Sequence, residues 1–239
     1  MNQADNNPEQ WLVAHRGDQS HEVENTLKAF AAAVDGGALF AECDIQFSRD
    51  LVPVVIHDNH LKRLCDLDLH ISLLDLVDLK ELCYPYFKLL LLRKFLTWLK
   101  AQPHLTLFIE VKPDVRERIS DADIAGVLAR EIDAPLLPQI VIISESAGIL
   151  EACRSKLNCR IGWVAEGSDE PACPLDYVFM HHAAAATIAA WHERGVKVGL
   201  YTINDAELAA EMRRLGADLI ESDHFSRLQN ELAGGHGSE

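Results

Sequence analysis

Short apolar runs alternate with longer amphipathic stretches along almost the whole chain. The short runs, rich in β-branched residues, predict strands at residues 11–17, 39–46, 52–58, 105–113, 138–146, 160–167, 177–182, 196–204 and 218–223. Between them, apolar residues at helical spacing predict helices at residues 24–38, 73–101, 121–134, 147–157, 184–195 and 205–217. Because no linker or break in composition divides this pattern, we expect one domain over about residues 11–230, with disordered tails at 1–10 and 231–239.

This alternation indicates an α/β protein, with a parallel sheet covered by helices. Nine strands in one domain fit a closed (β/α)8 TIM barrel better than an open sheet. A doubly wound fold is the alternative, but no G-x-G-x-x-G motif follows the first strand. The surplus strand has a local explanation, because the link at residues 48–51 is too short for a helical crossover. A hairpin that turns near Arg49 would place Asp44 opposite Ile56 and His57.

The net charge of the chain argues against two classes of binding partner. The chain has 239 residues, of which 49% are hydrophobic, and a formal net charge of −15. This charge argues against a nucleic-acid binder, which needs a basic face, and it weakens the case for attraction to anionic lipid. An anionic substrate must therefore meet local positive charge or a bound cation.

The cysteines and the apolar runs bear on the location of the protein. The six cysteines show no paired spacing such as C-x-x-C, and the polar start of the chain has no apolar secretory segment. We therefore expect free thiols and a cytoplasmic protein. The most apolar run, at residues 84–92, is too short to span a bilayer, so we expect part of a buried or cap helix and no stable membrane insertion.

Polar side chains stand where the predicted strands end. The set comprises His15-Arg16-Gly17, Glu42-x-Asp44, His57-Asp58, Glu110-x-Lys112, Thr202-x-Asn204 and Ser222-Asp223. In a (β/α)8 barrel the carboxyl ends of the strands form the catalytic face. Because ionisable groups at the ends of four strands are hard to explain as ordinary surface charge, we expect a catalytic site at this end of the barrel.

The acidic members of this set predict a metal site. Glu42 and Asp44 have period-two spacing, so on a regular strand they point to the same face, and Glu110 ends another strand. Carboxylates that converge repel by roughly 4 kcal/mol per pair at about 4 Å and an effective dielectric near 20. A divalent cation removes this conflict, and all-oxygen ligation favours Mg²⁺, Ca²⁺ or Mn²⁺ over zinc. The alternative is that the acids pair with Arg16, Lys112 or Arg63.

The basic members predict phosphate chemistry. His15 and His57 each end an apolar strand, so one can take a proton from an attacking oxygen while the other gives one to a leaving oxygen. The alternative for each is a neutral core histidine bonded to a backbone carbonyl. Arg16 and Lys112 suit an anionic group, most simply a phosphate. With a hard cation nearby, these residues predict metal-assisted cleavage of a phosphate ester.

Two helix starts have their own candidate residues. Asn25 is a suitable N-cap for a helix that begins near Thr26, with Glu24 orienting the histidine or arginine loop, although Asn25 could instead reach substrate. Asp121 or Asp123 is the expected N-cap of the helix that they begin.

In its motifs the sequence strongly resembles the glycerophosphodiester phosphodiesterase family. The matching pieces are "HRG" at 15–17, "ENT" at 24–26, "AECDIQFSRD" at 41–50, "PVVIHD" at 53–58, "IEVKP" at 109–113, "YTIN" at 201–204 and "GADLIESD" at 216–223. Each piece is short, but they follow the family order over almost the whole chain. The resemblance implies a distorted (β/α)8 barrel and hydrolysis of glycerophosphodiesters to sn-glycerol 3-phosphate and an alcohol such as choline or ethanolamine.

Carried over to the matching positions, the resemblance implies a role for each member of the set. His15 and His57 correspond to the general acid–base pair, and Arg16 and Lys112 to the phosphate-binding cations. The ligands of one divalent ion, Mg²⁺ or Ca²⁺ with Mn²⁺ as a further candidate, correspond to Glu42, Asp44 and Glu110. In the family reaction the glycerol 2-hydroxyl attacks phosphorus, and water opens the resulting cyclic phosphate.

Three features depart from the family pattern. The segment over the active-site mouth, at about residues 60–100, is shortened, Ser144-Glu145 stands in place of Ser-Phe, and Tyr201 stands in place of a frequent Trp. These changes concern the substrate more than the reaction. Two other functions therefore stay open: a lysophospholipase D-type phosphodiesterase, and a barrel that binds phosphodiesters or a metal without turnover.

Overall fold

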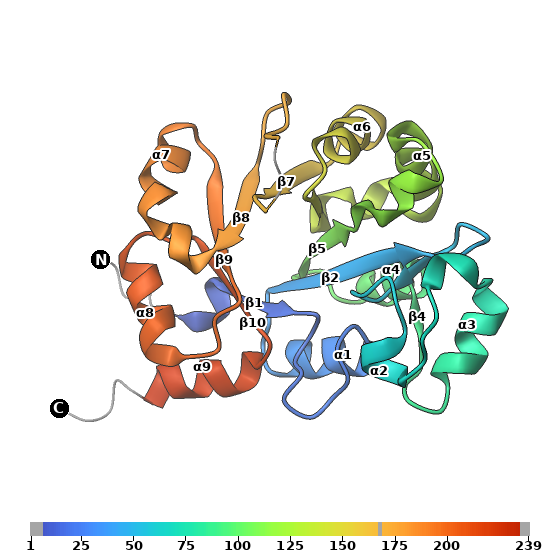
Figure 1. The fold of residues 1–239 in the computed structure, drawn as a ribbon. Helices are drawn as coiled ribbons and strands as arrows, with labels where there is room; N and C mark the ends of the chain where they lie inside the picture. Colours follow the sequence, from blue (N-terminus) through green and yellow to red (C-terminus); the bar gives the residue numbers. More distant parts are fainter. Residues whose placement is uncertain (1–6, 167–168, 235–239) are drawn as a thin grey trace.

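A closed parallel barrel forms the body of the protein. The computed structural model describes residues 7–166 and 169–234, so the tails expected at 1–6 and 235–239 lie outside the described residues. Within the described part, eight parallel strands close into a ring in which β10 pairs with β1 and β1 pairs with β2 (Figure 1). In ring order they are β1 (Leu12–His15), β2 (Phe40–Phe47), β5 (Thr106–Val111), β6 (Ile140–Ser144), β7 (Arg160–Val164), β8 (Tyr177–His181), β9 (Lys197–Tyr201) and β10 (Leu219–Ser222). The predicted single-domain (β/α)8 barrel is confirmed.

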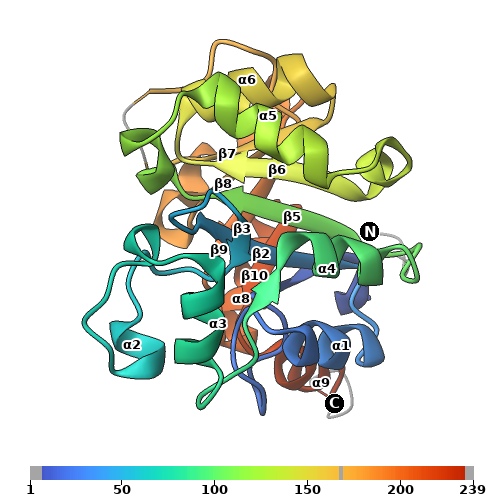
Figure 2. The same ribbon diagram turned by 90° about the vertical axis from the view of Figure 1, so that its right-hand side faces the viewer.

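Helices surround the barrel, because the outer faces of its strands are apolar and need cover (Figures 1 and 2). They are α1 (Leu27–Asp35), α4 (Leu92–Leu99), α5 (Asp121–Glu131), α6 (Ala147–Leu157), α7 (Ile188–Glu193), α8 (Ala206–Arg214) and α9 (Phe225–Gly234). Two more helices, α2 (Lys62–Cys65) and α3 (Leu76–Cys83), lie between β3 (Pro53–Val55) and α4 and pack in a separate apolar cluster. Short 3₁₀ turns lie at Pro8–Gln10, Ile71–Leu73, Pro113–Glu117, Ala134–Gln139 and His182–Thr187.

Side-chain hydroxyls cap the two helices for which acidic or amide caps were expected. Thr26 is extended and its side chain accepts a hydrogen bond from a backbone N–H of α1, whereas Asn25 has a left-handed φ of 56° and caps nothing. Ser120 likewise accepts a hydrogen bond from the amide of Asp123 and begins α5. The expected caps Asn25 and Asp121 or Asp123 are therefore wrong, because an N-cap needs extended backbone one residue before the first helical turn.

The surplus strands form an antiparallel extension of β2. β3 (Pro53–Val55) runs antiparallel to the end of β2, and β4 (Leu90–Leu91) pairs with the other edge of β3. The backbone N–H of Ile56 donates to the carbonyl oxygen of Asp44 at 3.0 Å, so the predicted hairpin is confirmed. It returns His57 to the carboxyl end of the barrel, where Asp44 lies.

The barrel has two apolar layers that follow the strand pleat. The outer layer packs strands against helices; α4, for example, contributes Phe95, whose ring lies 4.2 Å from that of Phe30 on α1. The inner layer fills the interior of the barrel, where the rings of Phe108 and Phe179 pack edge to face with their centroids 5.0 Å apart. Because alternate residues of a strand face opposite sides, the same strands can bury apolar groups outside and carry polar groups inside.

An insert between β3 and α4 has an apolar core of its own (Figure 2, around α2 and α3). This insert core comprises Val54, Ile56, Leu61, Cys65, Ile71, Leu79, Cys83, Phe87 and Leu89. The reduced cap was expected at about residues 60–100. This prediction is wrong for α4 (Leu92–Leu99), which packs into the outer layer of the barrel and not into the insert. Residues 84–92 are not a helix either: α3 ends at Cys83, Pro85 follows, and the run continues as a turn, β4 and the first residue of α4.

The described ends of the chain pack on each other. Residues 8–10 form a 3₁₀ turn, residues 231–234 continue α9, and the Gln229 side chain donates to Glu9 at 3.1 Å. The expected disorder at 1–10 and 231–239 is thus wrong for residues 8–10 and 231–234. All six cysteines are free thiols, as expected. None of the helices within 7–166 and 169–234 is long and apolar enough to cross a membrane.

Candidate active site

Three acidic side chains converge inside the carboxyl end of the barrel. Glu42 and Asp44 lie two residues apart on β2, and Asp44 stands in register with Glu110 on the neighbouring β5. One carboxylate oxygen from each of the three lies within 4.8 Å of the others. The sequence prediction that these acids meet is confirmed, because the strand pleat turns all three inward.

Two cations contact Asp44, the most buried of these acids. Arg16 Nε lies 3.0 Å from Asp44 Oδ2, and Lys112 Nζ lies 2.9 Å from Oδ1. Burial alone would raise the pKa of Asp44, but Lys112 and Arg16 bring it well below its usual range, so the carboxylate is charged. Lys112 also reaches Glu110 at 2.6 Å. Pairing with Arg16 and Lys112, the alternative to a metal, therefore accounts for part of the acid cluster.

Two buried acids remain without such a partner. Within the described residues, Oε1 of Glu42 and Oε1 of Glu221 on β10 have no hydrogen-bond donor. Burial and then neighbouring carboxylates raise the pKa of both groups far above the usual value. Burial also raises the pKa of Glu110 to about 7, despite Lys112. The Glu42 oxygen without a donor lies among the three converging carboxylates, and this all-oxygen donor set fits a hard divalent cation.

His15 is held at one side of the cluster by an aspartate. Its Nδ1 lies 2.7 Å from Oδ1 of Asp223, and its Nε2 points to Glu42 at 3.8 Å. Asp223 is in turn bonded by Asn204 at 2.9 Å, and these bonds lower the pKa of Asp223 to about 2 although burial opposes them. Asp223 therefore keeps the proton on His15 Nδ1 and leaves Nε2 facing the acids.

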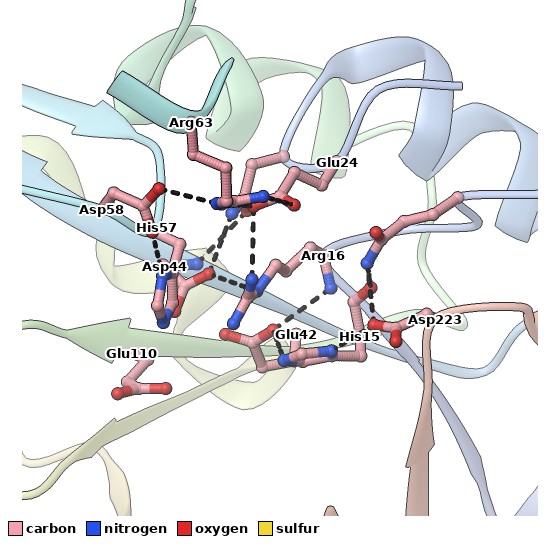
Figure 3. A network of polar contacts seen from close by, with 12 residues as sticks. His15, Arg16, Glu24, Glu42, Asp44, His57, Asp58, Arg63, Glu110 and Asp223 are labelled. Carbon is pink, nitrogen blue, oxygen red and sulfur yellow. Dashed lines mark hydrogen bonds and ion pairs between the residues drawn. The ribbon is translucent and has the colours of Figure 1, made fainter. Parts of the chain in front are cut away.

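His57 lies at the other side of the cluster in Figure 3. Its Nδ1 is 2.6 Å from Asp58, and Asp58 accepts from Arg63 at 2.7 Å. Arg63 makes two further bonds to Glu24, at 2.6 and 2.7 Å, and Glu24 also accepts from Arg16. This chain of ion pairs ties the insert to the first barrel loop. Glu24 thus orients the arginine loop, as expected.

A cavity of about 630 Å³ opens beside His57 and Lys112. Its other lining residues are Gln46, Asp58, Asn59, His60, Lys62, Arg63, Pro113, Asp114 and Glu145. Glu145, which departs from the family pattern, thus stands in the wall of the same cavity as His57 and Lys112. A substrate that reached the acids through this cavity would meet carboxylates in its walls.

Sequence reasoning gave Asn25 a helix cap or a contact with substrate, not a contact with the acids, and it gave Glu221 no role. The Asn25 amide donates to Asp44 at 2.8 Å, and its oxygen accepts from the Asp44 backbone N–H at 3.3 Å. The left-handed φ of Asn25 turns its side chain toward Asp44, so that both contacts form. A single left-handed residue leaves no periodic pattern in the sequence from which this contact could be predicted. Glu221 had a readable signal, an acid inside the apolar strand "LIES" of β10.

Comparisons with known proteins identify the family of the chain. Residues 15–227 match the sequence model of the glycerophosphoryl diester phosphodiesterase family. Glycerophosphodiester phosphodiesterase 1 from Rattus norvegicus is 46% identical over 54 residues, which make up 23% of this chain and 16% of that protein. A glycerophosphodiester phosphodiesterase from Caldanaerobacter subterraneus is 44% identical over 52 residues, 22% of this chain and 21% of that protein. The aligned segments are thus short parts of both curated relatives.

Solved structures share the whole barrel. A glycerophosphodiester phosphodiesterase from Parabacteroides distasonis has a TM-score of 0.80 at 22% identity, and the match covers 95% of this chain and 98% of that chain. A phosphodiesterase from Oleispira antarctica, solved in complex with the product sn-glycerol-3-phosphate, has a TM-score of 0.78 at 21% identity over 93% and 96% of the two chains. These likenesses show the fold. Because the family's sequence pattern extends over nearly all of the barrel, the chain belongs to the glycerophosphoryl diester phosphodiesterase family.

Proposed function

We propose that this protein hydrolyses glycerophosphodiesters to sn-glycerol 3-phosphate and an alcohol, with one bound divalent cation, Mg²⁺ or Ca²⁺. The observation that carries the proposal is the placement of two imidazoles around three converging carboxylates (Figure 3). His15 and His57 each direct Nδ1 to an aspartate, at 2.7 and 2.6 Å. Each Nε2 is therefore free to exchange a proton with substrate.

Lys112 and Arg16, together with the metal ion held by the acids, balance the negative charge of the phosphate. Glu42, Asp44 and Glu110 hold the metal ion, which when bound stabilises negative charge on a phosphate oxygen. Lys112 keeps a third ammonium proton beyond those that face Asp44 and Glu110, so it can donate to a second oxygen. Arg16 supplies a further fixed charge beside Asp44.

The two histidines move protons during ester cleavage. The glycerol 2-hydroxyl, which the family resemblance implies as nucleophile, loses its proton to one imidazole as the other imidazole protonates the departing alcohol. Water then opens the cyclic phosphate with the two roles reversed. Burial lowers the pKa of His57 and favours its neutral form, which suits the group that accepts the first proton.

The cavity wall favours a cationic alcohol such as choline or ethanolamine. Asp58 is neutralised by Arg63, but Glu145 has no ion-pair partner within the described residues. We expect Glu145→Gln to raise KM for glycerophosphocholine about 2- to 5-fold, the size of one half-exposed ion pair, and to leave KM for glycerophosphoglycerol unchanged. Glu193→Gln, on the exposed end of α7, is the matched control.

A substrate panel with and without divalent ions tests the whole proposal. Glycerophosphocholine, glycerophosphoethanolamine and lysophosphatidylcholine are assayed after EDTA treatment and after addition of Mg²⁺, Ca²⁺ or Mn²⁺. We expect release of sn-glycerol 3-phosphate that EDTA abolishes and a divalent ion restores. Preference for lysophosphatidylcholine would instead assign a lysophospholipase D-type activity.

Single histidine variants test the proton transfers. His15→Ala and His57→Ala are expected to lower kcat about 10²- to 10⁴-fold, the usual contribution of general acid–base catalysis. His104→Ala, which changes an exposed histidine outside the site, should leave kcat unchanged. Wild-type rates in both active-site variants would defeat the proposed mechanism. Tight binding of substrate and metal without turnover would favour a binding barrel.

The six free thiols support a further part of the proposal, a reducing compartment such as the cytoplasm. Labelling of free thiols in protein taken directly from cells tests this point, and a disulfide there would contradict it.

A further inference from the structure

A second hollow lies away from the catalytic cavity, between α1 and the segment that joins α3 to α4. This lysine-rimmed groove has a volume of about 810 Å³ and shares no lining residue with the catalytic cavity. Its lining residues are Glu22, Val23, Thr26, Leu27, Lys28, Ala31, Lys80, Tyr84, Tyr86, Phe87, Lys88, Leu89, Leu90, Leu91, Lys94 and Trp98. Residues of the loop before α1 and of the segment between α3 and β4 both line the groove, and Figure 2 shows both segments at the lower edge of the molecule.

The charge of the groove opposes that of the whole protein. Four lysines and one glutamate line it, whereas the chain has a net charge of −15. Within the described residues, no ion pair neutralises Lys28, Lys80, Lys88 or Lys94, although Lys62, Lys100 and Lys112 all have acidic partners. The groove is therefore a local basic surface that is complementary to an anionic partner.

Apolar and aromatic side chains are exposed among these lysines. Tyr84 is 80% exposed and Tyr86 is 51% exposed, on the turn that follows α3. Val23, on the facing loop, and Leu27, the first residue of α1, are 38% and 37% exposed. Tyrosines whose rings meet an apolar layer while their hydroxyls stay hydrated, next to lysines that reach phosphates, are the side chains that settle at a membrane interface.

We propose that the lysine-rimmed groove docks the protein reversibly on the surface of an anionic phospholipid bilayer. The exposed apolar side chains enter the headgroup layer, and the four lysines contact lipid phosphates. A small soluble anion would use the lysines but would leave the exposed tyrosines without a role. The net charge of the chain is unfavourable at long range, but within a Debye length of about 8 Å the groove lysines dominate.

This docking brings the membrane close to the proposed active site. Val23 and Leu27 line the groove, and between them Glu24 bonds Arg16 while Asn25 bonds Asp44. In the short segment 23–27, Val23 and Leu27 therefore line the groove, while Glu24 and Asn25 contact residues of the proposed active site. Docking does not depend on the proposed hydrolysis and can be measured without turnover.

Vesicle flotation tests the proposal on the full chain. The probes are vesicles of phosphatidylcholine alone and vesicles with about 30% phosphatidylglycerol, in 50 mM and 500 mM salt. We expect binding to the anionic vesicles in low salt, and loss of that binding in high salt or on neutral vesicles. Replacing Lys80 and Lys88 together with Gln should weaken binding roughly 30-fold, since each lysine near an anionic surface contributes roughly 5-fold.

Matched variants separate the groove from a general charge effect. Lys156→Gln with Lys197→Gln makes the same change in net charge on α6 and β9, and it should leave vesicle binding unchanged. Tyr84→Ser with Tyr86→Ser keeps the charge and should still weaken binding at least 5-fold. Thermal melting of every variant confirms that the fold is intact.

Three results would overturn the proposal. The first is no binding of the wild-type protein to anionic vesicles in low salt. The second is equal weakening by the groove and control lysine variants. The third is undiminished binding to monomeric short-chain phosphatidylglycerol with no gain on vesicles, which would make the groove a site for single amphiphiles.

Discussion

The carboxylate of Glu110 makes the stability of the metal-free protein depend on pH. Burial raises its pKa to about 7 in the folded state, from an ordinary value of 4.5. Between these two pH values the folded state binds the proton and the unfolded state does not, so the free energy of unfolding falls as pH rises. At 1.36 kcal/mol per pKa unit, the loss that is complete above pH 7 amounts to about 3 kcal/mol.

Glu110→Gln removes this loss because the amide has no charge to bury. The free energy of unfolding is measured by urea denaturation in EDTA at pH 5, 6, 7 and 8 for both proteins. We expect an advantage for Glu110→Gln that grows from about 1 kcal/mol at pH 5 to about 3 kcal/mol at pH 8. Burial lowers the pKa of His57, which makes the free energy of unfolding rise with pH. Because both proteins contain His57, this contribution cancels in their difference, which then reports Glu110 alone.

Divalent cations should offset this loss of stability at high pH. A metal ion that uses Glu110 stabilises the wild type more at pH 8 than at pH 5, because it must displace a proton at low pH. At 100 times the dissociation constant the gain is about 2.7 kcal/mol, and Glu110→Gln should lose most of it. A constant difference between the proteins from pH 5 to 8, or equal stabilisation of both by Mg²⁺ and Ca²⁺, would refute this account of the acid cluster.

Three further changes test other parts of the structure. Asp223→Asn should lower kcat at least about 10-fold with little change in KM or melting temperature, since His15 loses the acceptor that orients it; an unchanged kcat would contradict this role. Gly17→Ala should lower the free energy of unfolding in urea by about 2–4 kcal/mol, because φ is +87° and the new Cβ would lie 2.6 Å from the carbonyl carbon of Ala29; a shift under 0.5 kcal/mol would exclude that clash. Phe108→Ala should cost about 3–5 kcal/mol in the same assay, as it empties the centre of the inner barrel layer; a loss under 1 kcal/mol would mean that the layer collapses around the gap.

Much of the fold and of the acid cluster could be read from the sequence. The period of two places Glu42 and Asp44 on one face of β2, and the short link after β2 requires a hairpin that returns His57. Both signals are local, because the strand pleat and the length of a connection depend on few neighbours.

The contacts that complete the site could not be read in this way. Asn25 meets Asp44 because its backbone is left-handed, and Glu24 meets Arg63 because the insert packs beside the first barrel loop. Both depend on residues far apart in the sequence. The error at residues 84–92 has a similar origin: β4 exists because β3 offers an open edge there, which outweighs the helical preference of a leucine-rich run.

The two histidines of the proposed mechanism are attached to different apolar cores. His15 ends a strand that is packed into the barrel, whereas His57 follows Ile56, a member of the insert core. The spacing of the two imidazoles is therefore set by how the insert sits on the barrel, which the Arg63–Glu24 contact controls. Partial unfolding of the insert would separate the proton donor from the proton acceptor while the barrel stays folded. On heating, enzymatic activity should therefore be lost at a lower temperature than the secondary structure of the barrel.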